Sequence, residues 1–238
     1  MIELVVLDMA GTTVADEHEV EKCFADAARQ TGLITDDARI LAMQGLHKYF
    51  VFETLWAEQL GSEQHPDWRT RVDTSYETFT RGLEHHYLTQ PIKPTEGCLE
   101  LFDYLHQKGI KIALTTGFYR KVCTIILERL GWLEGLDAAY VGTADSIIQA
   151  SITSDEVEKG RPHPYMIQKA MRLLGVTDPK RVINVGDTPS DIASGKAAGC
   201  LFSVAVTNGT HALEQLAPHQ PDSLVGSLSG LIELIENN

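Results

Sequence analysis

The fold is decided near the N-terminus by residues 2–13, IELVVLDMAGTT. The apolar run is typical of a buried β-strand, and it stops abruptly at Asp8. A glycine turn with free backbone N–H groups follows. A carboxylate at the carboxyl end of a buried strand, ahead of such a turn, is placed to attack an electrophilic phosphorus. The stretch therefore indicates an α/β protein with phosphoryl-transfer chemistry.

Composition bounds the class of protein. The chain has 238 residues and is 43% hydrophobic, which suits one large domain or two small ones with a buried core. Its net charge of -13 argues against nucleic acid and membrane surfaces as partners. Four scattered cysteines without metal spacing favour reduced thiols and a cytoplasmic location. Because Met1 leads straight into the first strand, we expect no signal peptide.

The chain changes character along its length. Four helices and no strand are predicted over 17–32, 36–43, 48–60 and 66–88. A proline-rich connector, residues 90–97, follows. Strands are then predicted over 109–114, 138–141, 181–185 and 201–206, and helices up to 130, over 164–174 and over 190–198. This alternation implies a parallel sheet with helices on both faces.

These patterns predict two domains. We expect a Rossmann-like α/β core, residues 1–15 and 94–238, interrupted by an all-helical cap, residues 16–93. Both junctions lie beside the first strand, so the cap would cover the carboxyl ends of the strands, where ligands bind. The aromatic residues Trp68, Tyr76 and Phe79 fit either the core of the cap or a homodimer surface on it.

Four polar segments accompany the strands in order. They are Asp8, residues 115–117 (TTG), residues 160–164 (GRPHP) and residues 186–191 (GDTPSD). Each segment alone would fit an ordinary turn or helix cap. The ordered set on successive strands favours a catalytic site at one edge of the sheet.

Each segment has a role in displacement at phosphorus. Asp8 can attack and form an aspartyl-phosphate. Thr116 and the amides around Gly117 can donate hydrogen bonds to phosphoryl oxygens without adding negative charge. Arg161 supplies a fixed positive charge that offsets repulsion between carboxylate and phosphoryl group. Asp187 offers hard oxygen ligands for Mg²⁺.

These segments resemble the haloacid dehalogenase superfamily, and more narrowly its phosphonatase branch. Most phosphatases of the superfamily carry a second Asp two residues after the nucleophile and a Lys at the basic position. Here Ala10 and Arg161 stand there, as in the phosphonatase branch. The resemblance implies that Asp8, Asp187 and the backbone carbonyl of Ala10 hold Mg²⁺. It further implies a phosphate pocket and supporting shell of Gly11, Thr12, Thr115, Gly117 and Asp191.

Ala10 also bears on the substrate. Without an acid at this position, ester cleavage would be slowed by roughly 10²–10⁴-fold. Cleavage of a C–P bond instead expels a carbanion, which an imine between a Lys and a neighbouring aldehyde would stabilise. The cap segment 45–48, GLHK, matches the Gly-x-x-Lys of the phosphonatase branch, which implies that Lys48 forms the imine. The alternative is an exposed lysine that opens the next helix.

Three positions depart from the pattern of the branch. Val51 stands where a His is expected, His18 where a Cys is expected, and Gln44 where a Met is expected. These positions shape the pocket around the aldehyde, so the carbon skeleton of the substrate stays open. His18 and His47 flank the expected cleft and are candidates for proton transfer.

Three functions compete at this point. The first is a Mg²⁺-dependent hydrolase that cleaves the C–P bond of a 2-oxo-alkylphosphonate. The second is a phosphatase acting on small phosphate esters or acyl phosphates. Acyl phosphates have good leaving groups that need less help from an acid, so Ala10 is compatible with their hydrolysis. The third is a binding module without catalysis. In each case the expected partner is a small phosphonate or phosphate.

Overall fold

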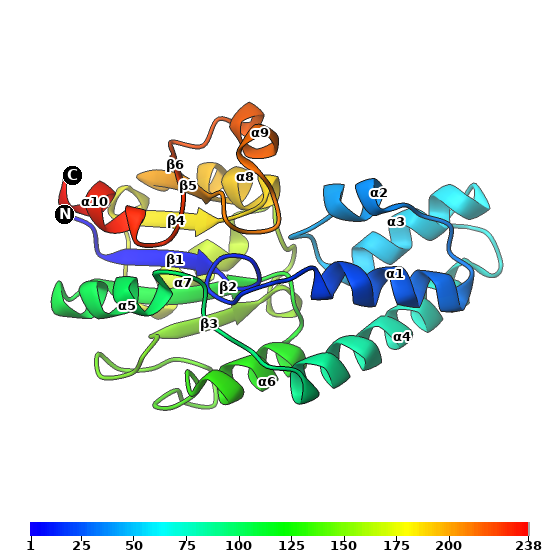
Figure 1. Cartoon of the computed structure of the whole chain (residues 1–238), viewed down its shortest axis with the longest axis horizontal. Helices are drawn as coiled ribbons and strands as arrows, with labels where there is room; N and C mark the ends of the chain where they lie inside the picture. The colour runs from blue at the N-terminus through cyan, green and yellow to red at the C-terminus, as the bar shows by residue number, and fades with distance from the viewer. Residues whose placement is uncertain (238) are drawn as a thin grey trace.

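The computed structural model describes residues 1–237, which form a parallel sheet of six strands flanked by helices (Figure 1). The strand order is β3-β2-β1-β4-β5-β6. The strands are β1 (Leu4–Asp8), β2 (Lys111–Thr116), β3 (Ala150–Thr153), β4 (Val182–Gly186), β5 (Phe202–Val206) and β6 (Ser223–Val225). The helices beside them are α5 (Cys98–Gln107), α6 (Arg120–Leu130), α7 (Tyr165–Leu173), α8 (Pro189–Ala198), α9 (Leu213–Leu216) and α10 (Gly230–Glu236). Short 3₁₀ turns occupy Ser154–Glu156, Pro179–Arg181 and Ala217–His219.

The period of two along a strand explains the layers. In β1, Val5 and Leu7 pack on one face with residues of α5, α6 and α10. Leu4 and Val6 pack on the other face with residues of α7. Every residue of β1 is buried, and the strand is apolar up to its last residue, Asp8, as is typical of a parallel sheet covered on both faces.

Four further helices lie beyond the carboxyl ends of the strands (Figure 1). They are α1 (Glu19–Thr31), α2 (Asp37–Ala42), α3 (Lys48–Leu60) and α4 (Trp68–Thr89), called here the four-helix segment. The rings of Phe24 and Phe52 stack in its centre with centroids 4.3 Å apart, against Phe79. Trp68 and Phe79 are buried, so these two predicted aromatics contribute to the core rather than to an open surface.

Most predicted elements are confirmed within one to three residues, but one strand is misplaced. Residues 138–141 form a turn, and Val141 contributes only an isolated bridge to Ala150. The Asp137 side chain causes this, because its Oδ1 atom accepts hydrogen bonds from the amides of Ala139 and Val141 at 2.8 and 2.9 Å. The strand itself, β3, lies at Ala150–Thr153.

Some elements have no counterpart in the sequence prediction. They are α5, α9, α10 and β6. The predicted boundaries of core and cap remain predictions. Within residues 1–237, the structure has no helix with the length and apolar character needed to cross a bilayer.

Candidate active site

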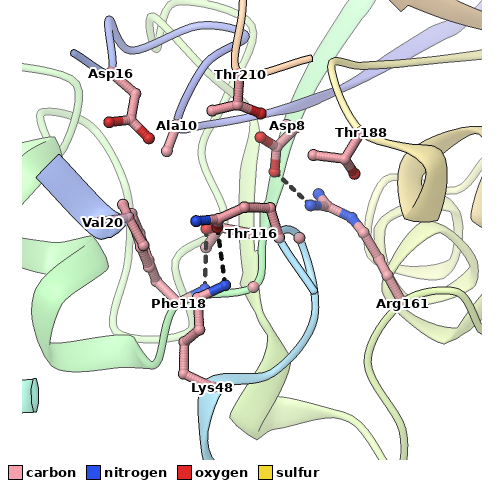
Figure 2. Close-up of a pocket in the computed structure, with 13 residues that line it drawn as sticks. Asp8, Ala10, Asp16, Val20, Lys48, Thr116, Phe118, Arg161, Thr188 and Thr210 are labelled. Carbon is pink, nitrogen blue, oxygen red and sulfur yellow. Dashed lines mark hydrogen bonds and ion pairs between the residues drawn. The ribbon is translucent and has the colours of Figure 1, made fainter. Parts of the chain in front are cut away.

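The sheet order brings the predicted polar segments together. Strands β2, β1 and β4 are neighbours, and all three run in the same direction. Their carboxyl ends therefore place Thr116, Asp8 and Asp187 along one edge. Lys48 enters from the four-helix segment and Arg161 from the loop before α7, so five separate parts of the chain meet (Figure 2).

A cavity of about 370 Å³, including its mouth, lies at this meeting point. It is lined by Asp8, Ala10, Asp16, Val20, Gln44, Gly45, Lys48, Thr116, Gly117, Phe118, Arg161, Thr188 and Thr210. All four predicted catalytic side chains, those of Asp8, Lys48, Thr116 and Arg161, are in this set.

Arg161 is fixed by its contacts. Its Nη1 donates to Asp8 Oδ1 at 2.5 Å, and its Nη2 donates to the carbonyl and hydroxyl oxygens of Thr115 at 2.9 and 2.8 Å. Its Nε lies 2.9 Å from Asp191 Oδ1. The guanidinium fork thus holds the predicted nucleophile in one orientation. Thr115 orients Arg161, and Asp191 also accepts from the Thr188 amide in the cap of α8.

Asp187 is held from two sides. Its Oδ2 accepts from the amide and hydroxyl of Thr210, both at 2.7 Å, and its Oδ1 accepts from the hydroxyl of Thr12 at 3.0 Å. Gly11 packs directly against it, because a Cβ there would lie 2.2 Å from Asp187 Oδ2. The turn after β1 must therefore contain glycine at this position for Asp187 to reach the site.

The charge of the site fits a divalent cation. Carboxylate oxygens of Asp8, Asp187 and Asp191 lie within 4.8 Å of one another, and all three residues are buried. Within residues 1–237, Arg161 is the one cation paired with them. Burial, reinforced by the charge of Asp191, raises the pKa of Asp187 to about 6. Burial also raises the pKa of Asp8, against the opposing charge of Arg161. A second positive charge would relieve both shifts, and carboxylate oxygens are suitable ligands for Mg²⁺.

Lys48 opens helix α3, yet it is not an exposed lysine. Its side chain is 7% exposed and reaches the cavity, where Nζ donates to Gln44 Oε1 at 3.0 Å and to the Leu46 carbonyl at 3.5 Å (Figure 2). Burial lowers the pKa of Lys48 to about 8, although the charges of Asp16 and Asp8 oppose the shift. About one tenth of the amine is therefore neutral at pH 7, as an imine-forming amine requires.

Two loops close the cavity between the sheet and the four-helix segment. Gly45 has a φ of 76°, and a Cβ there would lie 2.3 Å from Ser190 Oγ. A Cβ on Gly117 would lie 2.9 Å from the carbonyl oxygen of Gly45. The Thr116 hydroxyl accepts from the Phe118 amide at 3.1 Å, which leaves its proton for a ligand.

Several lining residues were not identified from the sequence as site residues. Asp16 and Thr210 are the most polar of these. Thr210 lies four residues after β5, at the edge of the sheet where ligands bind. This position is the sequence signal that could have identified it. The two histidines considered for proton transfer, His18 and His47, do not line the cavity. The side chain of His18 is 62% exposed and contacts Glu21.

Comparison with known proteins gives a consistent result. The family model of haloacid dehalogenase-like hydrolases matches residues 2–199. The phosphonoacetaldehyde hydrolase of Bacillus thuringiensis (strain Al Hakam) is 29% identical over 251 residues, which cover 99% of this chain and 87% of that protein.

Solved structures share the fold. A phosphonoacetaldehyde hydrolase-like protein from Oleispira antarctica superposes with a TM-score of 0.78 at 21% identity, over 99% of this chain and 92% of that one. A protein described as a predicted phosphoglycolate phosphatase from Haemophilus somnus gives 0.75 at 18% identity, over 98% of each chain. With its family model, its full-length relative and its site geometry in agreement, this chain belongs to the haloacid dehalogenase-like hydrolases.

Proposed function

We propose that the protein is a Mg²⁺-dependent hydrolase that cleaves the C–P bond of a 2-oxo-alkylphosphonate such as phosphonoacetaldehyde. The observation that carries the proposal is the buried amine of Lys48, which lines the same cavity as Asp8 and Ala10. Ala10 has no acidic side chain and cannot protonate the leaving group of an ester. An imine on Lys48 would accept the electron pair of a carbanion leaving group. The name of the Bacillus relative supports the same substrate class.

The reaction uses the two ends of the cavity in turn. The neutral amine of Lys48 attacks the carbonyl carbon, and loss of water leaves a protonated imine. Asp8 then attacks phosphorus, and the electron pair of the breaking C–P bond moves into the imine to give an enamine and an aspartyl-phosphate. Protonation and hydrolysis of the enamine release the aldehyde, and water releases phosphate from Asp8.

The phosphoryl end of the cavity is built for an anion. Arg161 touches the nucleophile and offsets its repulsion with the phosphoryl oxygens. The Thr116 hydroxyl and the amide of Gly117 donate hydrogen bonds to the same oxygens. Thr115 and Asp191 hold Arg161 in place, while Thr12 and the close approach of Gly11 hold Asp187.

Asp8, Asp187 and the backbone carbonyl of Ala10 would hold the Mg²⁺. Bound there, the ion supplies positive charge that neutralises the nucleophile and the phosphoryl oxygens. The donor set is made of hard oxygen atoms, and Arg161 supplies only one positive charge for the three buried carboxylates, which favours such an ion.

The domain assignment belongs to the same proposal. Residues 1–15 and 94–238 would form the catalytic core, and residues 16–93 the cap that excludes water from the imine. We expect a small phosphonate or phosphate as the partner, with neither nucleic acid nor a membrane. A homodimer through the cap and a cytoplasmic location also remain expectations.

A second candidate function is a phosphatase acting on acyl phosphates or small phosphate esters. Asp8, Arg161 and Asp187 form a set that does not depend on Lys48, and this observation keeps the candidate open. Such a phosphatase would need no imine.

Two variants separate the candidates. Phosphate release is measured from phosphonoacetaldehyde and from acetyl phosphate with Mg²⁺ present. We expect Asp8→Asn to abolish release from phosphonoacetaldehyde, Lys48→Ala to do the same, and the exposed Lys22→Ala control to match the wild type. Full phosphonoacetaldehyde cleavage by Lys48→Ala would reject the imine, and acetyl phosphate hydrolysis alone in the wild type would favour the phosphatase.

A further inference from the structure

Three ionisable side chains lead away from the cavity toward the outside of the four-helix segment. Asp16, in the loop before α1, lines the cavity together with Lys48. Figure 2 shows both side chains directed into the space between them. Glu19 is the first residue of α1, and His86 lies in the last turn of α4. His86 lines a second, separate cavity on the surface between these two helices.

Each of the three residues Asp16, Glu19 and His86 lies close to the next. Asp16 Oδ1 accepts from the Glu19 amide at 2.9 Å, and the charge of the Glu19 carboxyl acts on that of Asp16. Glu19 Oε1 lies 3.9 Å from His86 Nε2. The line thus runs from the catalytic cavity to the partly exposed imidazole of His86.

The two carboxyl groups hold different charges. Burial, reinforced by the charge of Glu19, raises the pKa of Asp16 to about 8, so this carboxyl is protonated at neutral pH. Burial alone would raise the pKa of Glu19, but Asp16 and the charge of His86 hold it below its usual value. A protonated donor beside an ionised acceptor is the arrangement that passes a proton.

Two buried oxygen atoms in and beside these carboxyl groups also bear on the role of this cluster. Within residues 1–237, Glu19 Oε2 and the hydroxyl oxygen of Tyr87 are buried without a hydrogen-bond partner. Burial, followed by the charges of Asp16 and Glu19, raises the pKa of Tyr87 well above its usual value. A cluster that served only to begin a helix would be expected to satisfy its buried polar atoms.

We propose that Asp16 is an acid–base residue of the reaction and that Glu19 and His86 connect it to solvent as a proton relay. The inference rests on the proposed C–P bond cleavage and deepens it. The charged groups around Asp16 are Glu19 from α1, Lys48 from α3 and Asp187 beyond β4, with the Tyr87 hydroxyl of α4 beside them.

Proton balance requires such a path. Asp16 gives one proton to the carbinolamine hydroxyl, which leaves as water, and a second to the enamine carbon after the C–P bond breaks. It regains one proton when water hydrolyses the resulting imine and frees Lys48. One proton per turnover must therefore arrive from outside while the aldehyde carbon is still bound, and Glu19 with His86 supplies the route. The proton released when the aspartyl-phosphate is hydrolysed restores the balance with solvent.

The first test uses Asp16→Asn. The amide keeps an oxygen to accept from the Glu19 amide, so the start of α1 is preserved, but the acid is lost. We expect kcat on phosphonoacetaldehyde to fall by roughly 10²–10⁴-fold. In the wild type kcat should fall again above about pH 8, as Asp16 loses its proton, and this limb should disappear in the variant. An unchanged kcat and pH profile in Asp16→Asn would overturn the proposal.

The second test uses the outer end of the relay. His86→Ala should lower kcat, and free imidazole should restore it, because the surface cavity beside α4 opens where the ring was. His85→Ala is the matched control, since His85 is exposed and lines the same surface cavity, and it should behave as the wild type. Equal kcat values in the two variants, or no response to imidazole, would reject the relay. A wild-type enzyme that releases no phosphate from phosphonoacetaldehyde would instead reject the proposed function, and the relay with it.

Discussion

The side-chain amide oxygen of Gln44 accepts a hydrogen bond from Lys48 Nζ at 3.0 Å, and both residues are buried at the cavity wall. The resemblance to the phosphonatase branch implies a Met at this position, which could not make the same contact. An acceptor beside an ammonium group favours the charged amine, whereas burial favours the neutral one. Gln44 therefore tunes the fraction of Lys48 that is ready to attack a carbonyl carbon.

Two substitutions at Gln44 should shift activity in opposite directions along the pH axis. Gln44→Met removes the acceptor and should lower the pKa of Lys48 from about 8, so kcat should rise at a lower pH than in the wild type. Gln44→Glu adds a negative charge and should raise the pKa of Lys48, so kcat should rise at a higher pH than in the wild type. The measurement is kcat against pH on phosphonoacetaldehyde. If kcat rises at the same pH in the two variants, the role of Gln44 is contradicted.

Stabilisation by Mg²⁺ should depend on pH. The pKa of Asp187 rises from 3.8 to about 6 on folding, so protonated Asp187 stabilises the metal-free protein, and this contribution is lost as the pH rises through about 6. Mg²⁺ binds the ionised carboxylate. The increase in melting temperature on adding Mg²⁺ should therefore be small at about pH 5 and large at about pH 8. A shift that is equal at both pH values, or that survives Asp187→Asn, would place the metal elsewhere.

Arg161 should matter for stability as well as for activity. Arg161→Met leaves the buried carboxylates of Asp8 and Asp191 without their cation, and should lower the free energy of unfolding by roughly 3–5 kcal/mol. Arg39 pairs with Glu58 on the surface, so Arg39→Met should cost at most about 1 kcal/mol. The free energies of unfolding of both variants are measured in urea without metal. Similar losses would show that the buried ion pairs of Arg161 stabilise the protein no more than a surface pair.

Closure of the cavity depends on Gly45. Gly45→Ala would combine the strain of a positive φ with contact against Ser190 Oγ, whereas Gly61→Ala would carry the strain alone, since nothing lies within 4 Å of its Cβ. The strain should cost each variant about 1–2 kcal/mol of stability, and the contact should make the loss larger in Gly45→Ala. Only Gly45→Ala should lose kcat/KM for phosphonoacetaldehyde. Equal losses of kcat/KM in the two variants would mean that strain, not closure, is responsible.

The central strands and the ordered polar segments could be predicted because both follow from local rules. An apolar run that ends in a polar residue predicts a buried strand, and parallel order then places Asp8, Thr116 and Asp187 at one edge. The resemblance to the phosphonatase branch added Lys48, whose burial no local pattern indicates. Its place in the helix α3 is the one an exposed lysine would also occupy.

Other features depend on burial and on side-chain contacts that the pattern of apolar residues does not reveal. Asp16 has no local signal, because its raised pKa arises from burial and from Glu19 across the start of α1. The misplaced strand at 138–141 has a similar origin. Its residues are apolar enough for a strand, but the Asp137 carboxylate captures two amides of the segment, and the less apolar residues 150–153 pair with β2 instead.

The most direct test of the proposed function is borohydride reduction in the presence of phosphonoacetaldehyde, followed by peptide mass spectrometry. A reduced adduct on Lys48 is predicted, present in the wild type and in Lys22→Ala and absent from Lys48→Ala, together with Mg²⁺-dependent release of phosphate. No adduct on Lys48 while phosphate is still released would contradict the imine mechanism and make the protein a phosphatase whose buried lysine serves another purpose.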